Sequence, residues 1–216
     1  MDMIRSKDLY RAKAFYESYA TSMVPGSTMW NDMRRLKDNM KRFRVTVLDK
    51  MADRLPGLSE TLQPERDLWG RETMHSRIRS PYKPDIVSLE MKRTAMEVDM
   101  HRDHYSADVE FSPAERDFFH KKAGEYSFRA LKKYMETTEF KNYQKLSIAG
   151  SHDATLAIHN AFNRELRTAR KAAEDELLAH PVLGPELNAE INAVAKAKHN
   201  AAVKLQNQLQ NQGQAQ

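Results

Sequence analysis

Hydrophobic side chains recur every three or four residues along Met29–Leu55. They form one stripe: Met29, Met33, Leu36, Met40, Phe43, Val47, Met51 and Leu55. This spacing predicts a single amphipathic helix of about 40 Å at 1.5 Å per residue. The polar face of that helix is basic, with Asp38 as the one acid among its cations: Arg34, Arg35, Lys37, Lys41, Arg42 and Arg44.

Proline and glycine separate this stretch from two further helical stretches. A first helix is expected at about 5–23, before Pro25-Gly26. A third is expected at about 60–79, after Pro56-Gly57, with Pro64 in its first turn. Three consecutive helices joined by short turns predict an antiparallel three-helix bundle over residues 4–80.

Residues 81–150 are predicted to form a helical extension. The two prolines of residues 80–84 favour an extended linker, after which Asp85 begins a helix to about Tyr105. Ser112-Pro113-Ala114-Glu115 has the sequence of a capping box with proline at the first helical position. It predicts an aromatic-rich helix to about Thr137, and Gly150-Ser151 is expected to end this region and cap the next helix.

The last part of the chain is rich in alanine, and residues 151–212 are predicted to be a helical hairpin. Its two helices are expected at Ser151–Ala179 and Pro185–Gln212, with residues 213–216 as a tail. The facing stripes are expected to be Phe162, Leu166, Ala169, Ala173 and Leu177 against Ile191, Val194, Ala201 and Leu205. Small side chains bury little area, so this hairpin is expected to lie on another subunit. The predicted fold class is therefore all-α.

Composition excludes several chemistries. The 216 residues include no cysteine, which excludes disulfides, thiolate metal sites and a cysteine nucleophile. No apolar run reaches the roughly 18 residues that a membrane-spanning helix needs. Asp2, Asp8 and Glu17 make a cleavable mitochondrial presequence unfavourable, because such presequences are poor in acids.

Leu9-Tyr10-Arg11 lies in the first predicted helix, ahead of the basic second helix. This combination resembles the LYR-motif family of small mitochondrial helical proteins, over about residues 4–80. Members of that family carry Leu-Tyr-Arg or Leu-Tyr-Lys early in a first helix and a basic second helix with a buried phenylalanine. The chain departs from the pattern at Met40, where the family would have phenylalanine, and places Phe43 one turn later.

The resemblance implies a non-catalytic accessory subunit of a mitochondrial complex, on the matrix side or associated with the inner membrane. Respiratory complex I is the first choice of host, and a LYR-like assembly factor or a subunit of the mitochondrial ribosome or ATP synthase is the alternative. The partners would be other subunits and acyl carrier protein. The implied docking residues are Leu9, Tyr10, Arg11, Arg34, Arg35, Lys37, Lys41 and Arg44.

No cofactor of the chain's own is implied. The acyl-phosphopantetheine of a bound acyl carrier protein would instead enter the predicted bundle. It would lie along a core stripe made of Met33, Leu36, Met40, Phe43 and Val47. Unbranched methionines suit this role because they repack around a flexible chain.

This implication gives a direct test. Replacing Arg11, Arg34 and Lys37 together by glutamate should abolish copurification with acyl carrier protein, because like charges would then face its acidic helix. The fold should survive, since surface substitutions usually cost little stability. Retained acyl carrier protein in the triple variant would count against the docking role.

Other interpretations of the same residues stay open. The basic face could bind nucleic acid together with the lysine- and aromatic-rich residues 118–145, lie on an anionic membrane, or be an ordinary solvated face. The carboxy-terminal hairpin could serve a cytoskeletal or virion structural protein through self-assembly.

Candidate chemistry in the sequence is weak. Acids and histidines at helical spacing give a loose metal pattern: Glu72, His75, Glu97, His101, His104, Asp108, Asp117 and His120. Ser151-His152-Asp153 has the letters of a hydrolase triad, but neighbours on a helix point about 100° apart, so a helix cap is the better interpretation. The chain is predicted not to be an enzyme and to hold no metal.

Overall fold

The computed structural model describes residues 40–44, 46–55, 57–75, 85–99 and 101–213, with side chains described as far as residue 204. This described part is mainly helical, as predicted, with six α-helices and one two-stranded sheet. The chain divides into two compact units. One comprises Met1–Asp67 and Arg71–Lys83, and the other comprises Leu68–Gly70 and Pro84–Gln216.

Backbone pairing organises the described residues of the first unit. The Lys41 N–H donates to the Thr73 carbonyl and the Lys41 carbonyl accepts from the Glu65 N–H, both at 2.8 Å. The Thr73 N–H in turn donates to the Glu65 carbonyl at 2.8 Å. Isolated antiparallel bridges accompany these bonds: Met40 with Met74, Arg42 with Pro64, and Arg66 with Glu72. Residues 40–43 and the neighbouring segments 63–66 and 72–74 therefore satisfy one another's backbone groups.

This pairing overturns two helix predictions. The helix expected over Met29–Leu55 is wrong for residues 40–44, which are extended, and only α3 (Val47–Ala52) is helical in its described part. A capping box formed by Thr46 and Asp49 begins α3. The helix expected at about 60–79 is wrong for residues 62–75, and η1 (Ser59–Thr61) is a single 3₁₀ turn before them. The helix expected at about 5–23 lies outside the described residues.

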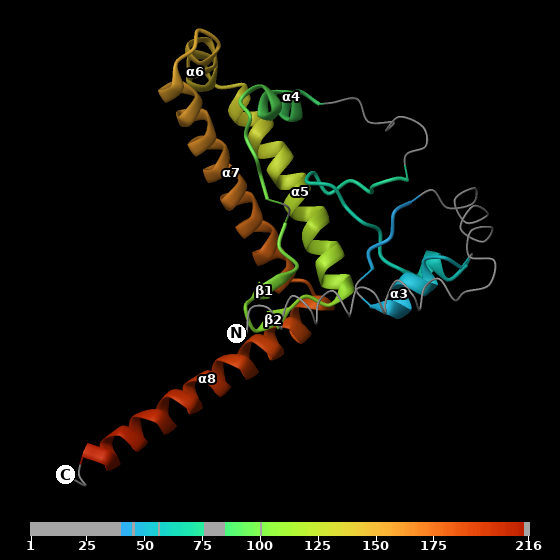
Figure 1. The fold of residues 1–216 in the computed structure, drawn as a ribbon, viewed down its shortest axis with the longest axis vertical. Coiled ribbons are helices and arrows are strands. Elements are labelled where there is room, and N and C mark those ends of the chain that lie inside the picture. The colour runs from blue at the N-terminus through green and yellow to red at the C-terminus, as the bar shows by residue number, and fades with distance from the viewer. Residues whose placement is uncertain (1–39, 45, 56, 76–84, 100, 214–216) are drawn as a thin grey trace, which may run out of the picture. The chain divides into compact units, whose positions relative to one another are not determined.

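The second unit is built on two long helices, α5 (Pro113–Met135) and α7 (His152–Leu178), which lie side by side (Figure 1). Both begin where the sequence predicted. The Ser112–Glu115 capping box forms in full, and the Ser151 hydroxyl accepts from the Ala154 N–H. The shorter α6 (Thr138–Ile148) connects them: α5 ends close to the predicted Thr137, but a separate helix after it was not predicted.

Helix α4 (Ile86–Arg93) begins at the predicted cap, because the Asp85 carboxylate accepts from the Ser88 N–H. It was predicted to continue to about Tyr105, and this is wrong. The Thr94 hydroxyl donates back to the Glu90 carbonyl at 3.0 Å, and Ala95 takes a left-handed backbone with φ of 51°. The chain then forms β1 (His104–Ser106) and β2 (Val109–Glu110), an antiparallel pair that the all-α prediction did not include.

The two helices predicted for the carboxy-terminal hairpin form, and the predicted contact between them is present near its tip, where Ala173 and Leu177 cluster with Leu187, Ile191 and Val194. The α7 stripe also packs against α5 and α6 of the same chain, so its burial does not require the other subunit that was expected. Helix α8 (Leu183–Gly213) packs through Leu187, with Leu183, Ile191 and Val194 partly buried. Residues 195–204, including the predicted contact Ala201, are exposed. Within the described residues, no helix combines the length and hydrophobicity needed to cross a membrane.

Candidate functional site

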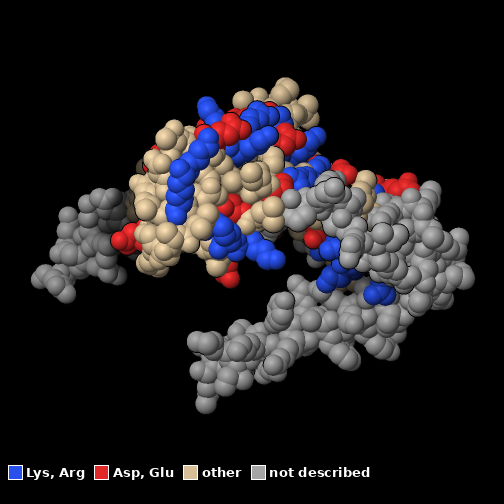
Figure 2. Space-filling model, turned by 90° about the horizontal axis from the view of Figure 1, so that it is seen from above, with Lys and Arg blue, Asp and Glu red and all other residues tan. Residues whose placement is uncertain are grey.

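Cations gather where α5 ends and α6 begins. Five exposed Lys and Arg side chains lie there: Arg129, Lys132, Lys133, Lys141 and Lys145. Two exposed acids accompany them, Glu136 and Glu139. Figure 2 views the end of the molecule that carries α6 and shows Lys and Arg side chains across this surface, with Asp and Glu side chains among them. This surface would therefore attract anionic groups.

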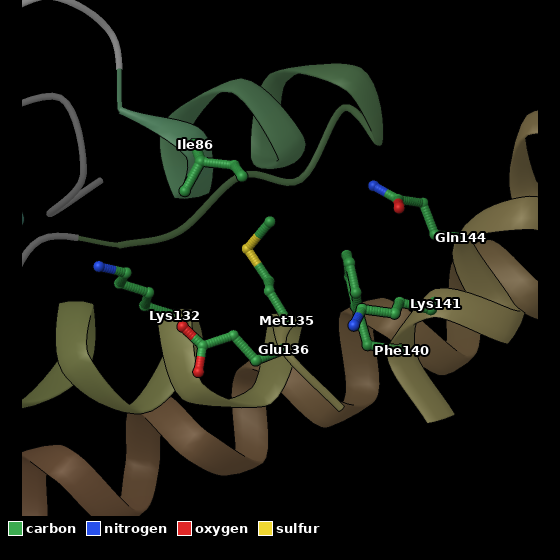
Figure 3. Close-up of a pocket in the computed structure, with 7 residues that line it drawn as sticks. All are labelled: Ile86, Lys132, Met135, Glu136, Phe140, Lys141 and Gln144. Atoms are coloured by element: carbon green, nitrogen blue, oxygen red, sulfur yellow. The ribbon is translucent and has the colours of Figure 1, made fainter. Parts of the chain in front are cut away.

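A pocket of about 260 Å³ opens within this cationic region, between α4, α5 and α6 (Figure 3). Its lining residues are Ile86, Lys132, Met135, Glu136, Phe140, Lys141 and Gln144. We call it the α4–α6 pocket. The Ile86, Met135 and Phe140 side chains point toward one another across it (Figure 3). The interior of the α4–α6 pocket is therefore apolar, with charged groups around it.

The floor of the pocket is rigidly supported. Phe140 is 2% exposed, and its ring lies against Tyr134 at 5.6 Å and Phe162 at 6.1 Å between centroids. These contacts connect α5, α6 and α7 and hold the ring in place. The Thr137 hydroxyl accepts from the Phe140 N–H at 3.2 Å and so fixes the backbone beneath that ring.

A buried carboxylate holds α4 against α6 on the other side. Glu90 accepts from the Gln144 amide at 3.0 Å and from the Arg93 Nε at 2.9 Å. Through this hydrogen bond Glu90 raises the pKa of Arg93, so the guanidinium remains charged. Arg93 also donates to the Ser147 hydroxyl at 3.2 Å. This network holds α4, and with it the Ile86 wall of the α4–α6 pocket, in a fixed position relative to Gln144 of α6.

The charged groups at the pocket are available to a ligand. Lys132, Lys141 and Glu136 are exposed, and none of the three makes an ion pair within the described part of the chain. Ile86 is 60% exposed and Leu89, one turn further along α4, is 52% exposed. The pocket thus combines an apolar interior, an apolar margin, two lysine ammonium groups and one carboxylate, that of Glu136.

The predicted docking residues are only partly described. Leu9, Tyr10, Arg11, Arg34, Arg35 and Lys37 lie outside the described residues, as do Met33 and Leu36 of the predicted core stripe. The Arg44 guanidinium pairs with buried Asp53 at 3.2 Å, and Lys41 is half-buried. Met40 and Phe43 are on extended backbone and Val47 is in α3, so these three do not share one helix face.

The loose metal pattern in the sequence does not assemble in the described part. The backbone is not helical at four of these residues, Glu97, His101, His104 and Asp108. Their spacing therefore does not bring them onto one helix face. No group of three or more possible ligands comes together among the described residues. Glu72 and His75 belong to the first unit, and His120 instead contacts the Arg102 carbonyl and Asp103. Ser151 caps α7, as predicted.

The α4–α6 pocket was not predicted from the sequence, because the expected helix ended at about Thr137 and no helix was assigned to residues 138–149. The sequence signal for this second helix was Thr137-Thr138-Glu139, a hydroxyl cap followed by an acid in a first helical turn.

No family model, curated protein or solved structure matches this chain. The chemistry available at the pocket is recognition: apolar contact inside it and charge-assisted hydrogen bonds at its margin.

Proposed function

We propose that this chain is a non-catalytic helical subunit of a larger protein assembly, and that it binds an acidic segment of a partner protein in the α4–α6 pocket. The observation that carries the proposal is the apolar interior beside Lys132 and Lys141. An engineered cavity of about 150 Å³ holds benzene, so 260 Å³ accommodates one aromatic or large aliphatic side chain. Carboxylates flanking that side chain would meet the two ammonium groups.

The recognition mode is that of a helix or short segment laid on an apolar surface with one inserted side chain. Ile86 and Leu89 extend the apolar surface along α4, where a second side chain of the partner would pack. Cations at the margin favour an acidic partner and speed its encounter more than they tighten the complex. Exposed residues 195–204 of α8 offer further contact area, as expected of a subunit.

A mitochondrial host, with respiratory complex I as first choice, is proposed from the LYR resemblance of residues 4–80 alone. That resemblance also implies acyl carrier protein as an acidic partner, docked at Leu9–Arg11 and Arg34–Lys37. The α4–α6 pocket is a different surface. The two proposals are therefore tested by different variants.

Replacing Lys132 and Lys141 together by glutamate should lower the affinity for acidic ligands at least about tenfold. The reason is that the ligand's carboxylates would then meet like charges at the pocket margin. The probe is a fluorescein-labelled amphipathic peptide with one central phenylalanine flanked by glutamates, followed by fluorescence anisotropy with the full chain. Binding to the unmodified chain should weaken as salt rises. A peptide with lysines in place of the glutamates should not bind.

The matched control is Lys121→Glu with Lys196→Glu, which makes the same change in net charge at exposed positions outside the pocket. This control variant should retain most of the affinity for the labelled peptide. Ile86→Asp should remove binding without loss of helical circular dichroism, because Ile86 is largely exposed. Equal weakening by both lysine pairs, or no effect of Ile86→Asp, would show that only overall charge is being measured and would overturn the pocket proposal.

A further inference from the structure

His101 is an imidazole buried at the meeting point of three segments of the second unit. It is 3% exposed and lies between the Leu68–Gly70 turn, α5 and α7. Its ring lies edge-on to Phe119 at 6.2 Å and to His120 at 5.8 Å between centroids. A group that ionises near neutral pH is therefore enclosed in the core.

Two hydrogen bonds fix which form of this imidazole fits. The Leu68 carbonyl, 2.9 Å from Nε2, can only accept, so Nε2 carries the proton. The Arg170 guanidinium donates through Nε to Nδ1 at 3.3 Å, so Nδ1 must be unprotonated. The geometry thus requires neutral His101. A second proton on Nδ1 would place donor against donor and cation against cation.

The charged groups around His101 offer no compensation for that proton. Arg170 of α7 and His120 of α5 both disfavour it. The nearby carboxylates have other partners: Asp103 pairs with His120 at 3.1 Å, and Glu174 of α7 pairs with Arg102 at 2.5 Å. Asp99 presents its backbone carbonyl to Arg170 at 2.7 Å. Arg116 and Asp117 of α5 act on His120 with opposite signs.

The turn that His101 contacts carries Trp69. The indole is buried, donates to the Ser88 hydroxyl of α4 at 3.0 Å, and lies edge-on to Phe128 of α5 at 5.5 Å. The adjacent Gly70 lies directly against Gly124 of α5. Displacement of His101 toward solvent removes the side chain that satisfies the Leu68 carbonyl, and an unsatisfied buried carbonyl destabilises this turn.

We propose that His101 is an acid-sensitive switch: its neutral ring holds residues 99–103 between α7 and the Leu68–Gly70 turn, and its protonation releases that turn and exposes Trp69.

Burial, and then the Arg170 charge, lower the pKa of His101 from 6.5 to about 4. The released form therefore takes up a proton near pH 6.5, whereas the packed form resists it until about pH 4. The packed form is fully favoured above pH 6.5 and loses stability as the pH falls from 6.5 to 4. The two pKa values differ by about 2.5 pH units. Full protonation therefore shifts the equilibrium between the packed and released forms toward the released form by roughly 300-fold.

Tryptophan fluorescence tests the switch in the full chain. Trp30→Phe leaves Trp69 as the sole indole. Its emission maximum and its quenching by acrylamide are followed from pH 7.5 to 4.5, beside circular dichroism at 222 nm. We expect a reversible red shift and increased quenching below pH 6.5, at pH values where most helical signal remains. In the same background, His101→Gln should reduce the change to less than about a third, because glutamine can donate to Leu68 without titrating.

His104→Gln is the matched control, since His104 is an exposed histidine three residues away, and it should leave the transition unchanged. If His101→Gln lacks helical signal at pH 7.5, Arg170→Gln replaces it and should shrink the transition by removing the opposing cation. A full-sized transition in a folded His101→Gln or Arg170→Gln chain would overturn the proposal. So would loss of the transition in His120→Gln with retention in His101→Gln, because His120 would then be the titrating group.

Discussion

Gly124→Ala is expected to destabilise the second unit by about 3 kcal/mol, the upper part of the range for overpacked cores, although alanine normally stabilises a helix. Gly124 lies within α5, where the helix crosses the Leu68–Gly70 turn. A Cβ at this position would lie 2.0 Å from the Gly70 nitrogen and 2.2 Å from the Trp69 carbonyl carbon. Both are backbone atoms, so no side-chain rotation relieves the clash, and either the turn or the helix has to move.

Urea unfolding followed by circular dichroism measures this loss. Gly70→Ala should be comparably costly, because its Cβ would lie 2.5 Å from the Lys121 carbonyl oxygen and φ is +74°. Gly150→Ala is the control for backbone strain alone, since φ is +94° and nothing lies within 4 Å of its Cβ. It should cost about 1 kcal/mol. A Gly124→Ala chain as stable as the unmodified one would mean that the turn is not packed on α5.

The parts of the fold that the sequence predicted are those fixed by neighbouring residues. The Ser112–Glu115 capping box acts across three residues, and the Ser151 cap does the same, so local chemistry located both helix starts. The early end of α4 was missed because Ala95 adopts positive φ without the glycine or proline that usually announces a break.

The incorrect predictions share a different cause. Residues 40–44 have helical spacing of hydrophobic side chains, yet their backbone groups bond to residues 63–73. Pairing between distant segments is not visible in a local periodicity, and here it prevailed over the helical pattern. The same limit hid the α4–α6 pocket, whose walls meet through Glu90 and Gln144, 54 residues apart. In the sequence Lys132 and Lys141 cannot be told from other surface lysines, because only the fold places Ile86 of α4 beside them.

The α7 stripe was expected to be weak because it contains alanines, but its large residues decide its energetics. Phe162 is fully buried, lies edge-on to Tyr134 at 6.0 Å between centroids, and stacks on Phe140 at 6.1 Å. The alanines at 169 and 173 let α5 approach closely, and Phe162, further toward the start of α7, reaches both α5 and α6. Small residues here enable packing instead of preventing it.

Phe162→Ala should therefore destabilise the second unit by about 4 kcal/mol, within the range for deleting a buried aromatic ring. The substitution removes the ring that supports Phe140. Binding of the acidic peptide in the α4–α6 pocket should therefore fall under conditions in which α5 and α7 remain folded. Leu156→Ala is the control on the same helix: Leu156 is 49% exposed, and its loss should cost less than about 0.5 kcal/mol. Unfolding by urea gives the stability change, and anisotropy of the labelled peptide gives the binding change. If Phe162→Ala cost no more than Leu156→Ala, the aromatic contact between α5, α6 and α7 would not be what holds the pocket together.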